Sequence, residues 1–300
     1  RDDCTVVQIP AECIGFVNGP HRETLLNMED TYGVFTLFLP GGEGDDAPER
    51  LAIFGPQRSR RGAELTAMSI VEKKKPGHFT NGVKDREITG KGFGTDRMTL
   101  RDDEVAYLLG AKGATLSKMA RASHTVMQVV GMMVFIAGNL EERQRCRDYI
   151  AWLLEQKDSK GNTAVDVTER TDVTEVPLPQ ALVGSIYGRG GCNMREIEQE
   201  TGTFCFPSDD ANGPRLLIFG HEEGTIWSET GRIKAERLVK SLINRKRREE
   251  QEWSSGRGGG GWASSGSRGG AWDRAGGSGW HKGRDRSRSP LRRKGTHWKE

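Results

Sequence analysis

The sequence has no long apolar run, because nowhere in its 300 residues do eighteen apolar residues follow one another. Its N-terminal stretch also lacks the basic and then apolar pattern of a secretory signal. We therefore expect neither a membrane span nor a signal peptide, although a chain that opens at Arg1 leaves open whether it is a fragment. A hydrophobic content of 34% suits two or three small domains better than one large core.

Cysteine is scarce and has no metal-binding pattern. The chain has five cysteines, an odd number, and no C-x-x-C pair. Zinc sites and disulfide frameworks need paired spacings or even sets. We therefore expect reduced thiols of an intracellular protein at Cys4, Cys13, Cys146, Cys192 and Cys205.

Catalytic motifs are missing as well. No glycine precedes Lys-Ser or Lys-Thr at the spacing of a P-loop, and the dinucleotide fingerprint would need glycine where Asn193 stands. None of the six histidines has a Cys, Asp or Glu partner at metal-ligand or triad spacing. We expect no catalytic residue, no metal, no cofactor and no small-molecule substrate, and hence a protein that is not an enzyme.

Positive charge is concentrated toward the C-terminal end. From Arg245 onward, 15 Lys and Arg stand against 6 Asp and Glu, whereas the preceding residues are mildly acidic and the net charge is only +3. A polyanionic partner would therefore be attracted mainly by this end of the chain.

The rest of the chain repeats one unit three times. The stretch "VVQIPAECIGFVNGPHRETLLNMEDTYGVFTLF" aligns with "TEVPLPQALVGSIYGRGGCNMREIEQETGTFCF", and these copies close with "RLAIFG" and "RLLIFG". A more diverged copy lies between them, with Gly110 and Gly113 at the places of Gly188 and Gly191. Units of roughly 65–75 residues are in the size range of small domains.

Each copy has the pattern of a strand, a helix, a glycine-rich loop, a helix, two strands and a closing helix. Short β-branched runs predict first strands at residues 5–9 and 174–178. An apolar spacing of three residues, as between Met194 and Ile197, indicates the second helix, which Gly202 should end as a C-cap. The predicted apolar stripes of two closing helices are Cys146, Tyr149, Ile150 and Leu153, and Ile226, Thr230, Ile233 and Leu238. This order predicts an α+β fold with a three-stranded antiparallel sheet covered by helices.

The repeat resembles the K homology (KH) domain of type I, and the third copy carries the resemblance best, with V-G-S-I-Y-G-R-G-G followed by I-x-x-x-T-G. The resemblance implies three tandem α+β domains, each with a three-stranded antiparallel sheet packed against three helices. The first linker between them is rich in Lys, Gly and Pro, so we expect it to be flexible. The corresponding division gives module 1 at residues 3–75, a linker at 76–95, module 2 at 96–157, a linker at 158–171, module 3 at 172–248 and a tail at 249–300.

The KH resemblance implies that the G-x-x-G loop between two helices clamps the backbone of about four single-stranded nucleotides. Glycines allow a close backbone approach, and the following helix N-terminus attracts phosphate. We assign Ile186 to the apolar floor of the groove. The RNA-binding loop residues carried over are Gly188, Arg189, Gly190 and Gly191 in module 3, and Gly110, Ala111, Lys112 and Gly113 in module 2.

Module 1 departs from this pattern. Its loop reads Gly19, Pro20, His21 and Arg22, so the last glycine is lost. A side chain at Arg22 should crowd the approach of a nucleic-acid backbone. We expect this module to serve packing or partner docking more than RNA binding.

The tail has a different composition, rich in Gly, Ser and Arg and poor in aliphatic residues, so we expect it to be disordered. It resembles the RGG boxes of RNA-binding proteins, and "RDRSRSP" resembles Arg-Ser segments of splicing-related proteins. Arginines such as Arg257 and Arg268 can neutralise phosphates, and Trp262 and Trp272 can stack on bases.

The sequence therefore predicts a single-stranded RNA-binding protein of RNA processing or post-transcriptional regulation, similar to poly(C)-binding and other hnRNP-type KH proteins. Single-stranded DNA remains an alternative ligand, and other RNA-processing proteins are candidate partners. The expected location is the nucleus, the cytoplasm or both, and "LRRK" slightly favours the nucleus. The alternative is a protein-interaction scaffold in which only the tail contacts nucleic acid.

Overall fold

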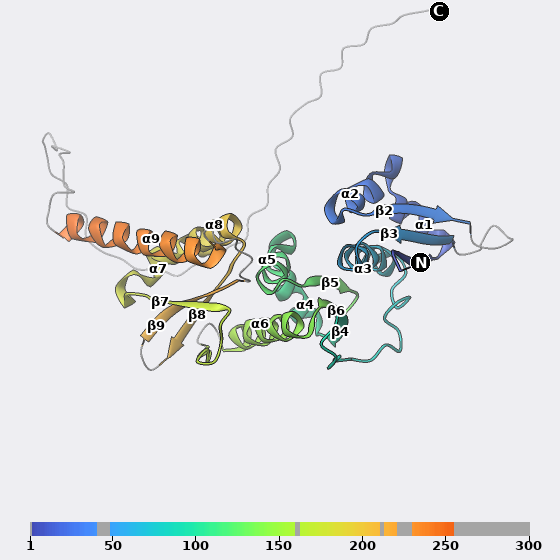
Figure 1. Ribbon diagram of the computed structural model, residues 1–300. Helices are drawn as coiled ribbons and strands as arrows, with labels where there is room; N and C mark the ends of the chain where they lie inside the picture. The colour runs from blue at the N-terminus through green and yellow to red at the C-terminus, as the bar shows by residue number, and fades with distance from the viewer. Residues whose placement is uncertain (1, 41–48, 160–162, 211–212, 221–229, 255–300) are drawn as a thin grey trace, which may run out of the picture. The chain divides into compact units, whose positions relative to one another are not determined.

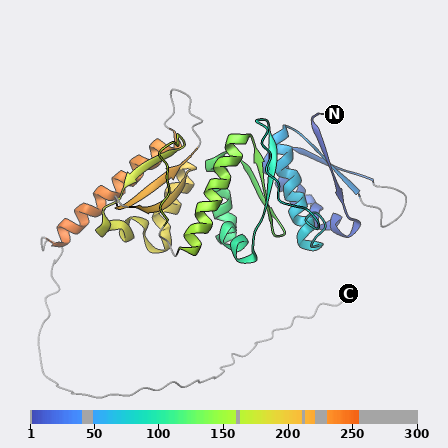
Figure 2. The same cartoon turned by 90° about the horizontal axis from the view of Figure 1, so that it is seen from below.

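The computed structural model describes residues 2–40, 49–159, 163–210, 213–220 and 230–254 (Figure 1). The described residues all belong to one compact unit, Arg1–Arg257. Within it, three modules each combine one three-stranded sheet with helices, as Figure 2 also shows. The mixed α+β class expected from the sequence is therefore confirmed.

All three modules have the same order of elements, which is strand, helix, loop, helix, strand, strand and helix. Module 1 consists of β1 (Cys4–Ile9), α1 (Ala11–Asn18), α2 (Glu23–Tyr32), β2 (Phe35–Leu39), β3 (Glu49–Phe54) and α3 (Gln57–Lys74). Module 2 consists of β4 (Gly94–Thr99), α4 (Asp102–Leu109), α5 (Ala114–Ser123), β5 (Val126–Val130), β6 (Met133–Gly138) and α6 (Leu140–Asp158). Module 3 consists of β7 (Val173–Pro177), α7 (Val183–Tyr187), α8 (Cys192–Thr201), β8 (Phe204–Asp210), β9 (Gly213–Phe219) and α9 (Gly231–Ser254).

In each sheet the third strand of the module lies between the first and the second, and both pairings are antiparallel. The second strand is therefore an edge strand, and it follows the helix that begins at the glycine loop. Gly33 and Gly202 end α2 and α8 with left-handed φ values of 63° and 71°. The predicted C-caps are therefore present, and their backbone requires the freedom of glycine.

The apolar spacing of the second helices correctly predicts which side chains are buried. Leu25 and Met28 of α2 are at most 3% exposed, and Met194 and Ile197 of α8 also lie in the core of their module. The predicted stripe of α6 is also correct, because all four of its residues are buried. The core of each module thus lies between its sheet and its helices.

The prediction for the last helix is wrong in register. Ile233 is 53% exposed, whereas the buried side chains of α9 are Ala235, Val239, Leu242 and Ile243. The helix also runs to Ser254, five residues beyond the point where the tail was expected to begin. Ile226 lies outside the described residues.

The segment expected to be a flexible linker is held by specific hydrogen bonds. The carboxylate of Glu72, at the end of α3, accepts from the backbone N–H groups of Gly77 and Phe79 at 2.6 and 2.8 Å. The fully buried Arg143 of α6 donates to the carbonyl oxygens of Ile88 and Gly90 at 2.7 and 3.2 Å. The segment between modules 1 and 2 is therefore part of the fold.

Each of the second and third sheets uses its outer face to contact the last helix of the preceding module. Leu65 of α3 is buried in one cluster with Phe135 of β6. Tyr149 and Trp152 of α6 pack against Phe219, with ring centroids 4.9 and 5.3 Å away. Phe204 and Phe206 of β8 are buried in the same cluster as Tyr149 of α6, whose ring lies 5.5 Å from that of Phe204. The modules are therefore joined through their cores.

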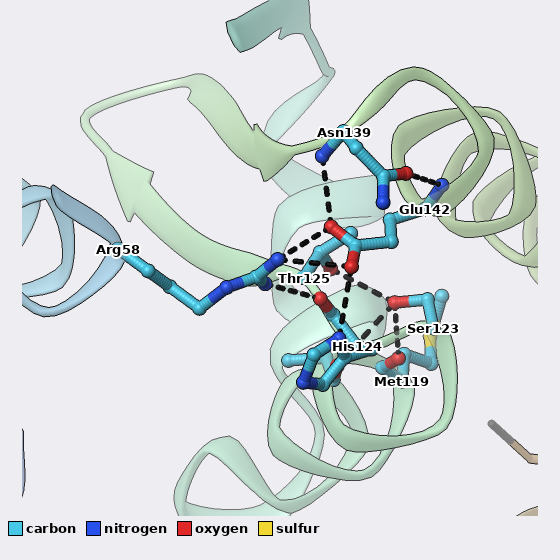
Figure 3. A network of polar contacts seen from close by, with 8 residues as sticks. Arg58, Met119, Ser123, His124, Thr125, Asn139 and Glu142 are labelled. Carbon is cyan, nitrogen blue, oxygen red and sulfur yellow. Dashed lines mark hydrogen bonds and ion pairs between the residues drawn. The ribbon is translucent and has the colours of Figure 1, made fainter. Parts of the chain in front are cut away.

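A polar network ties α3 of module 1 to the start of α6 in module 2 (Figure 3). Arg58 donates from Nη2 to both carboxylate oxygens of Glu142, at 2.9 and 2.7 Å, and from Nη1 to the carbonyl oxygen of His124. Glu142 accepts from the N–H of Asn139 at 2.8 Å and thereby completes a capping box. Burial opposes ionisation of Glu142, but these hydrogen bonds, including one with His124 Nδ1, lower the pKa of its carboxyl below the usual 4.5.

Candidate nucleic-acid interface

The first glycine of each loop is required by close packing. Gly19, Gly110 and Gly188 have φ values of 71°, 64° and 73° with extended ψ. A Cβ added at Gly110 would lie 2.2 Å from Thr115 Oγ1, and one at Gly188 would lie 2.8 Å from Cys192 Sγ. These contacts are closer than real Cβ atoms tolerate, so the chain can turn here only with glycine.

The last two positions of each loop are left-handed in all three modules. Module 3 has glycine at both positions, with φ of 59° at Gly190 and 76° at Gly191. In module 2 a lysine, Lys112, adopts φ of 54° before Gly113. The three loops therefore have one backbone shape, although their glycine content falls from module 3 to module 1.

Module 1 keeps this shape without any glycine at the two positions. His21 and Arg22 have φ of 50° and 64°, a conformation that costs L-residues energy. The loss of glycine seen in the sequence has therefore not changed the path of the backbone. What differs from module 3 is that these two positions carry the side chains of His21 and Arg22.

The loops of modules 2 and 3 are open to solvent and positively charged. Ala111, Lys112, Arg189 and Gly190 are exposed. A Cβ at Gly113 or at Gly191 would meet no atom within 4 Å. Within the described part of the chain, neither Lys112 nor Arg189 has an ion-pair partner.

Each of these loops leads directly into a helix of ten residues. Gly113 and Gly191 are the residues that precede α5 and α8, and no side chain caps either helix start. The first N–H groups of a helix have no partner within the helix and carry partial positive charge. The N–H of Ala114 donates to the Ala111 carbonyl oxygen and that of Cys192 to the Arg189 carbonyl oxygen. An exposed cation beside the positive end of a helix still favours an anion such as phosphate.

In module 1 the side chain of the last loop residue contacts the helix and the edge strand. Glu29 of α2 accepts from both the N–H and the hydroxyl of Thr36 on the edge strand β2, each at 2.7 Å. Arg22 Nη2 lies 3.8 Å from Glu29 Oε1 and donates to the Thr36 carbonyl oxygen at 3.5 Å. Loop, helix and edge strand of module 1 are thus linked by side chains.

Module 3 has the same contact at the equivalent helix position, and module 2 lacks it. Glu198 of α8 accepts from the N–H of Cys205 on the edge strand β8 at 2.9 Å, as Glu29 does in module 1. In module 2 the residue at the same position of the helix is Ala120, whose side chain cannot accept a hydrogen bond.

Burial raises the pKa of the Cys205 thiol to about 12, so this cysteine stays protonated at neutral pH.

Ile186 does not form an exposed groove floor. Its side chain is 0% exposed and lies in the core of module 3. Its carbonyl oxygen accepts from Asn193 Nδ2 at 3.0 Å, and the same amide also donates to the Ser185 carbonyl oxygen. Asn193, which sequence reasoning did not single out, thus ties the end of α7 to the start of α8 across the loop.

The tail residues assigned to RNA contacts, namely Arg257, Arg268, Trp262 and Trp272, lie outside the described residues. In the described ranges, no group of three or more His, Cys, Asp or Glu side chains could hold a metal ion. No described helix is both long and apolar enough to cross a membrane. All five cysteines are free thiols, as expected.

Comparison with known proteins gives a family match for the third module. Residues 173–227 match the family model described as the KH domain. Far upstream element-binding protein 1 of Homo sapiens is 21% identical over 225 residues, covering 70% of this chain and 34% of the relative. The Mus musculus protein is 21% identical over 222 residues, covering 69% and 33%. The chain thus spans about a third of the length of these curated relatives.

Three similar solved structures have low TM-scores. Dim2p from Pyrococcus horikoshii OT3 is 16% identical, with a TM-score of 0.27, over 50% of this chain and 89% of that chain. Its complex with a/eIF2alpha and rRNA gives 17% identity and a TM-score of 0.28 over 50% and 84%. A protein of unknown function from Aeropyrum pernix is 12% identical, with a TM-score of 0.27, over 84% and 97%. By sequence, then, the third module is similar to a KH domain, and the first two modules repeat its order of strands and helices.

Proposed function

We propose that the chain is a non-enzymatic protein with three KH modules, which binds single-stranded RNA through the loops of modules 2 and 3. The observation that carries this proposal is the shared shape of two exposed loops, each with an unpaired cation and each leading into an uncapped helix start. Such a loop can approach a sugar–phosphate backbone closely and compensate its charge.

The comparisons support nucleic acid as the ligand. A KH domain match covers the loop of module 3, and the curated relatives are named as proteins that bind a far upstream element. Single-stranded DNA offers the same phosphates and remains an alternative ligand. The basic tail would add affinity that does not depend on sequence, and the Arg-Ser stretch favours a role in RNA processing or post-transcriptional regulation with other RNA-processing proteins, in the nucleus or the cytoplasm.

The test is a charge reversal that leaves the backbone unstrained. Lys112→Asp with Arg189→Asp puts carboxylates against phosphates in both loops, and Asp tolerates the left-handed conformation at position 112. Two lost attractions and two new repulsions of about 1 kcal/mol each should weaken RNA binding roughly a hundredfold or more. Titration of labelled single-stranded RNA into the full chain measures this loss.

A matched control reverses two exposed charges outside the loops. Lys84→Asp with Lys91→Asp changes the net charge equally and lies in the segment between modules 1 and 2. If both double variants lowered the affinity equally, binding would depend on net charge and the loops would have no special role. Thermal melting of both variants shows that the fold is kept.

A second candidate function is a protein-interaction scaffold. The outer face of the first sheet exposes Val6, Phe35 and Leu37 at 52, 58 and 45%. In modules 2 and 3 the equivalent face is covered by a helix, so module 1 offers an apolar surface that a protein could use. On this hypothesis, deletion of the tail would abolish RNA binding while the loop variants would leave it unchanged.

A further inference from the structure

A hollow lies between the two helices that begin at the RNA-binding loops. It has a volume of about 430 Å³ and is formed by one side of α5 from module 2 and one side of α8 from module 3. No aromatic side chain lines it. Its polar lining residues are Thr115, Ser117, Lys118 and Arg121 of α5, and Arg195, Glu198 and Gln199 of α8.

The hollow adjoins both loops. On the α5 side its lining begins with Ala114 and Thr115, which directly follow Gly113 of the module 2 loop. On the α8 side, Arg195 has its guanidinium beside the module 3 loop, 3.9 Å from the position of a Cβ at Gly190. The hollow thus extends from the end of one loop to a guanidinium group beside the other.

The two walls of the hollow are fixed to one another. Lys118 Nζ of α5 donates to both carboxylate oxygens of Glu198 in α8, at 2.9 and 3.1 Å. The same ammonium lies 5.0 Å from the centroid of the Phe204 ring. Lys118 and Glu198 thus neutralise each other, and the pair holds α5 and α8 together.

The charge that remains in the hollow is positive. Arg121 and Arg195 are both exposed, and within the described ranges neither has an ion-pair partner. Thr115 and Ser117 add hydroxyl donors to this surface. Two free guanidinium groups and two hydroxyls, with no aromatic ring for a base to stack on, suit phosphate oxygens better than bases.

We propose that this hollow holds the sugar–phosphate backbone of RNA that passes from the loop of module 2 to the loop of module 3. The inference rests on the proposed function of the two loops and adds that they bind one continuous strand. Arg121 and Arg195 contact the phosphates between the two clamped segments. The Lys118–Glu198 pair sets the relative orientation of the loops, so that the strand need not order the modules when it binds.

The inference predicts a dependence on RNA length. A KH loop clamps about four nucleotides, so a strand of about five nucleotides can occupy one loop only. A strand of about fifteen nucleotides can occupy both loops and must then cross the hollow. The second loop is engaged at a high effective concentration, so the longer strand should bind much more tightly.

The experiment measures binding of the full chain to fluorescein-labelled, mixed-sequence single-stranded RNA of about five and about fifteen nucleotides. Arg121→Glu is the informative variant, because Arg121 lies two turns of α5 beyond the loop. We expect it to weaken binding of the longer RNA about tenfold and to leave binding of the shorter RNA unchanged. Arg195→Glu should act in the same direction, and Arg121→Gln should give a smaller loss.

The matched control is Lys84→Glu, an equal charge reversal at an exposed site away from the hollow. If Arg121→Glu and Lys84→Glu affected the longer RNA equally, the hollow would not hold the strand and the inference would be overturned. Failure of the proposed function gives a different result: Lys112→Asp with Arg189→Asp would then leave both RNA lengths bound as before. Loss of binding in that loop variant, without an effect of Arg121→Glu, would show that the two loops bind separate strands.

Discussion

Lys118 of module 2 and Glu198 of module 3 form an ion pair across 80 residues of sequence, with 2.9 Å between Nζ and Oε1. The carboxylate is almost fully buried and also accepts from the backbone of the edge strand β8. The lysine therefore compensates a buried charge at the same time as it joins the modules.

Removal of the lysine should destabilise the chain. In Lys118→Met the Glu198 carboxylate stays buried without its cation, which should lower the free energy of unfolding by about 1–3 kcal/mol. Chemical denaturation of the full chain measures this loss. In the double variant Lys118→Met with Glu198→Gln much of the loss should return, because no buried charge remains. Additive losses would show that the pair has no coupling.

The left-handed residues of the loops predict a gain in stability on substitution by glycine. His21→Gly and Lys112→Gly should each raise the free energy of unfolding by about 0.5–1 kcal/mol, because the relief of backbone strain exceeds the added entropy of the unfolded chain. Ala111→Gly is the matched control, since Ala111 stands in the same loop without a positive φ. It should lower the melting temperature. A loss in all three variants would mean that the loops store no strain.

Glu142 predicts that part of the folding stability is lost in acid. The pKa of its carboxyl is lowered in the folded chain, so the unfolded state binds the proton first as the pH falls. Its contribution is therefore complete above about pH 4.5 and is lost as the pH falls through the lower folded value. Urea denaturation between pH 3 and 7 should show a shallower acid dependence for Glu142→Gln than for the natural chain. Identical slopes would contradict the assignment.

The tail should carry most of the salt dependence of RNA binding. Deletion of residues 255–300 removes 11 Lys and Arg and leaves α9 whole. Each phosphate contact on a single strand contributes about −0.7 to the slope of log affinity against log salt, so the slope should flatten clearly. Selection of bound sequences should give the same preference with and without the tail. If deletion of the tail removed the sequence preference and left the salt dependence unchanged, the tail would read the sequence and the modules would supply the charge contacts.

Local signals in the sequence predicted the elements and the loops well. The spacing of Met194 and Ile197 and the glycine at position 202 depend on neighbours a few residues away, so they could be read directly. The sequence did not show which side of α9 is buried. Ile233 fits an amphipathic pattern as well as Ala235 does, and only the packed sheet selects between them.

Contacts between modules could not be predicted. Nothing near Arg58 in the sequence indicates Glu142 as its partner, and the order of the first linker depends on the buried Arg143, which lies more than fifty residues away. The contacts of Arg22 with Glu29 and Thr36 could not be predicted either, although they lie within one module. Such partners are set by how preformed elements pack, and a single sequence carries no local signal for that.

The second and third sheets are each covered by the last helix of the preceding module, and this has a consequence for synthesis at the ribosome. Translation completes α3 before β5 and β6, and α6 before β8 and β9. The aromatic face that contains Phe204 and Phe219 therefore finds its covering helix already made when it emerges. Domains fold from the N-terminus during synthesis, and exposed apolar sheets aggregate while they wait for partners. Because the helix is synthesised first, the apolar face of the sheet can be covered as soon as it forms. If the sheet were synthesised first, that face would stay exposed and could aggregate until the helix followed.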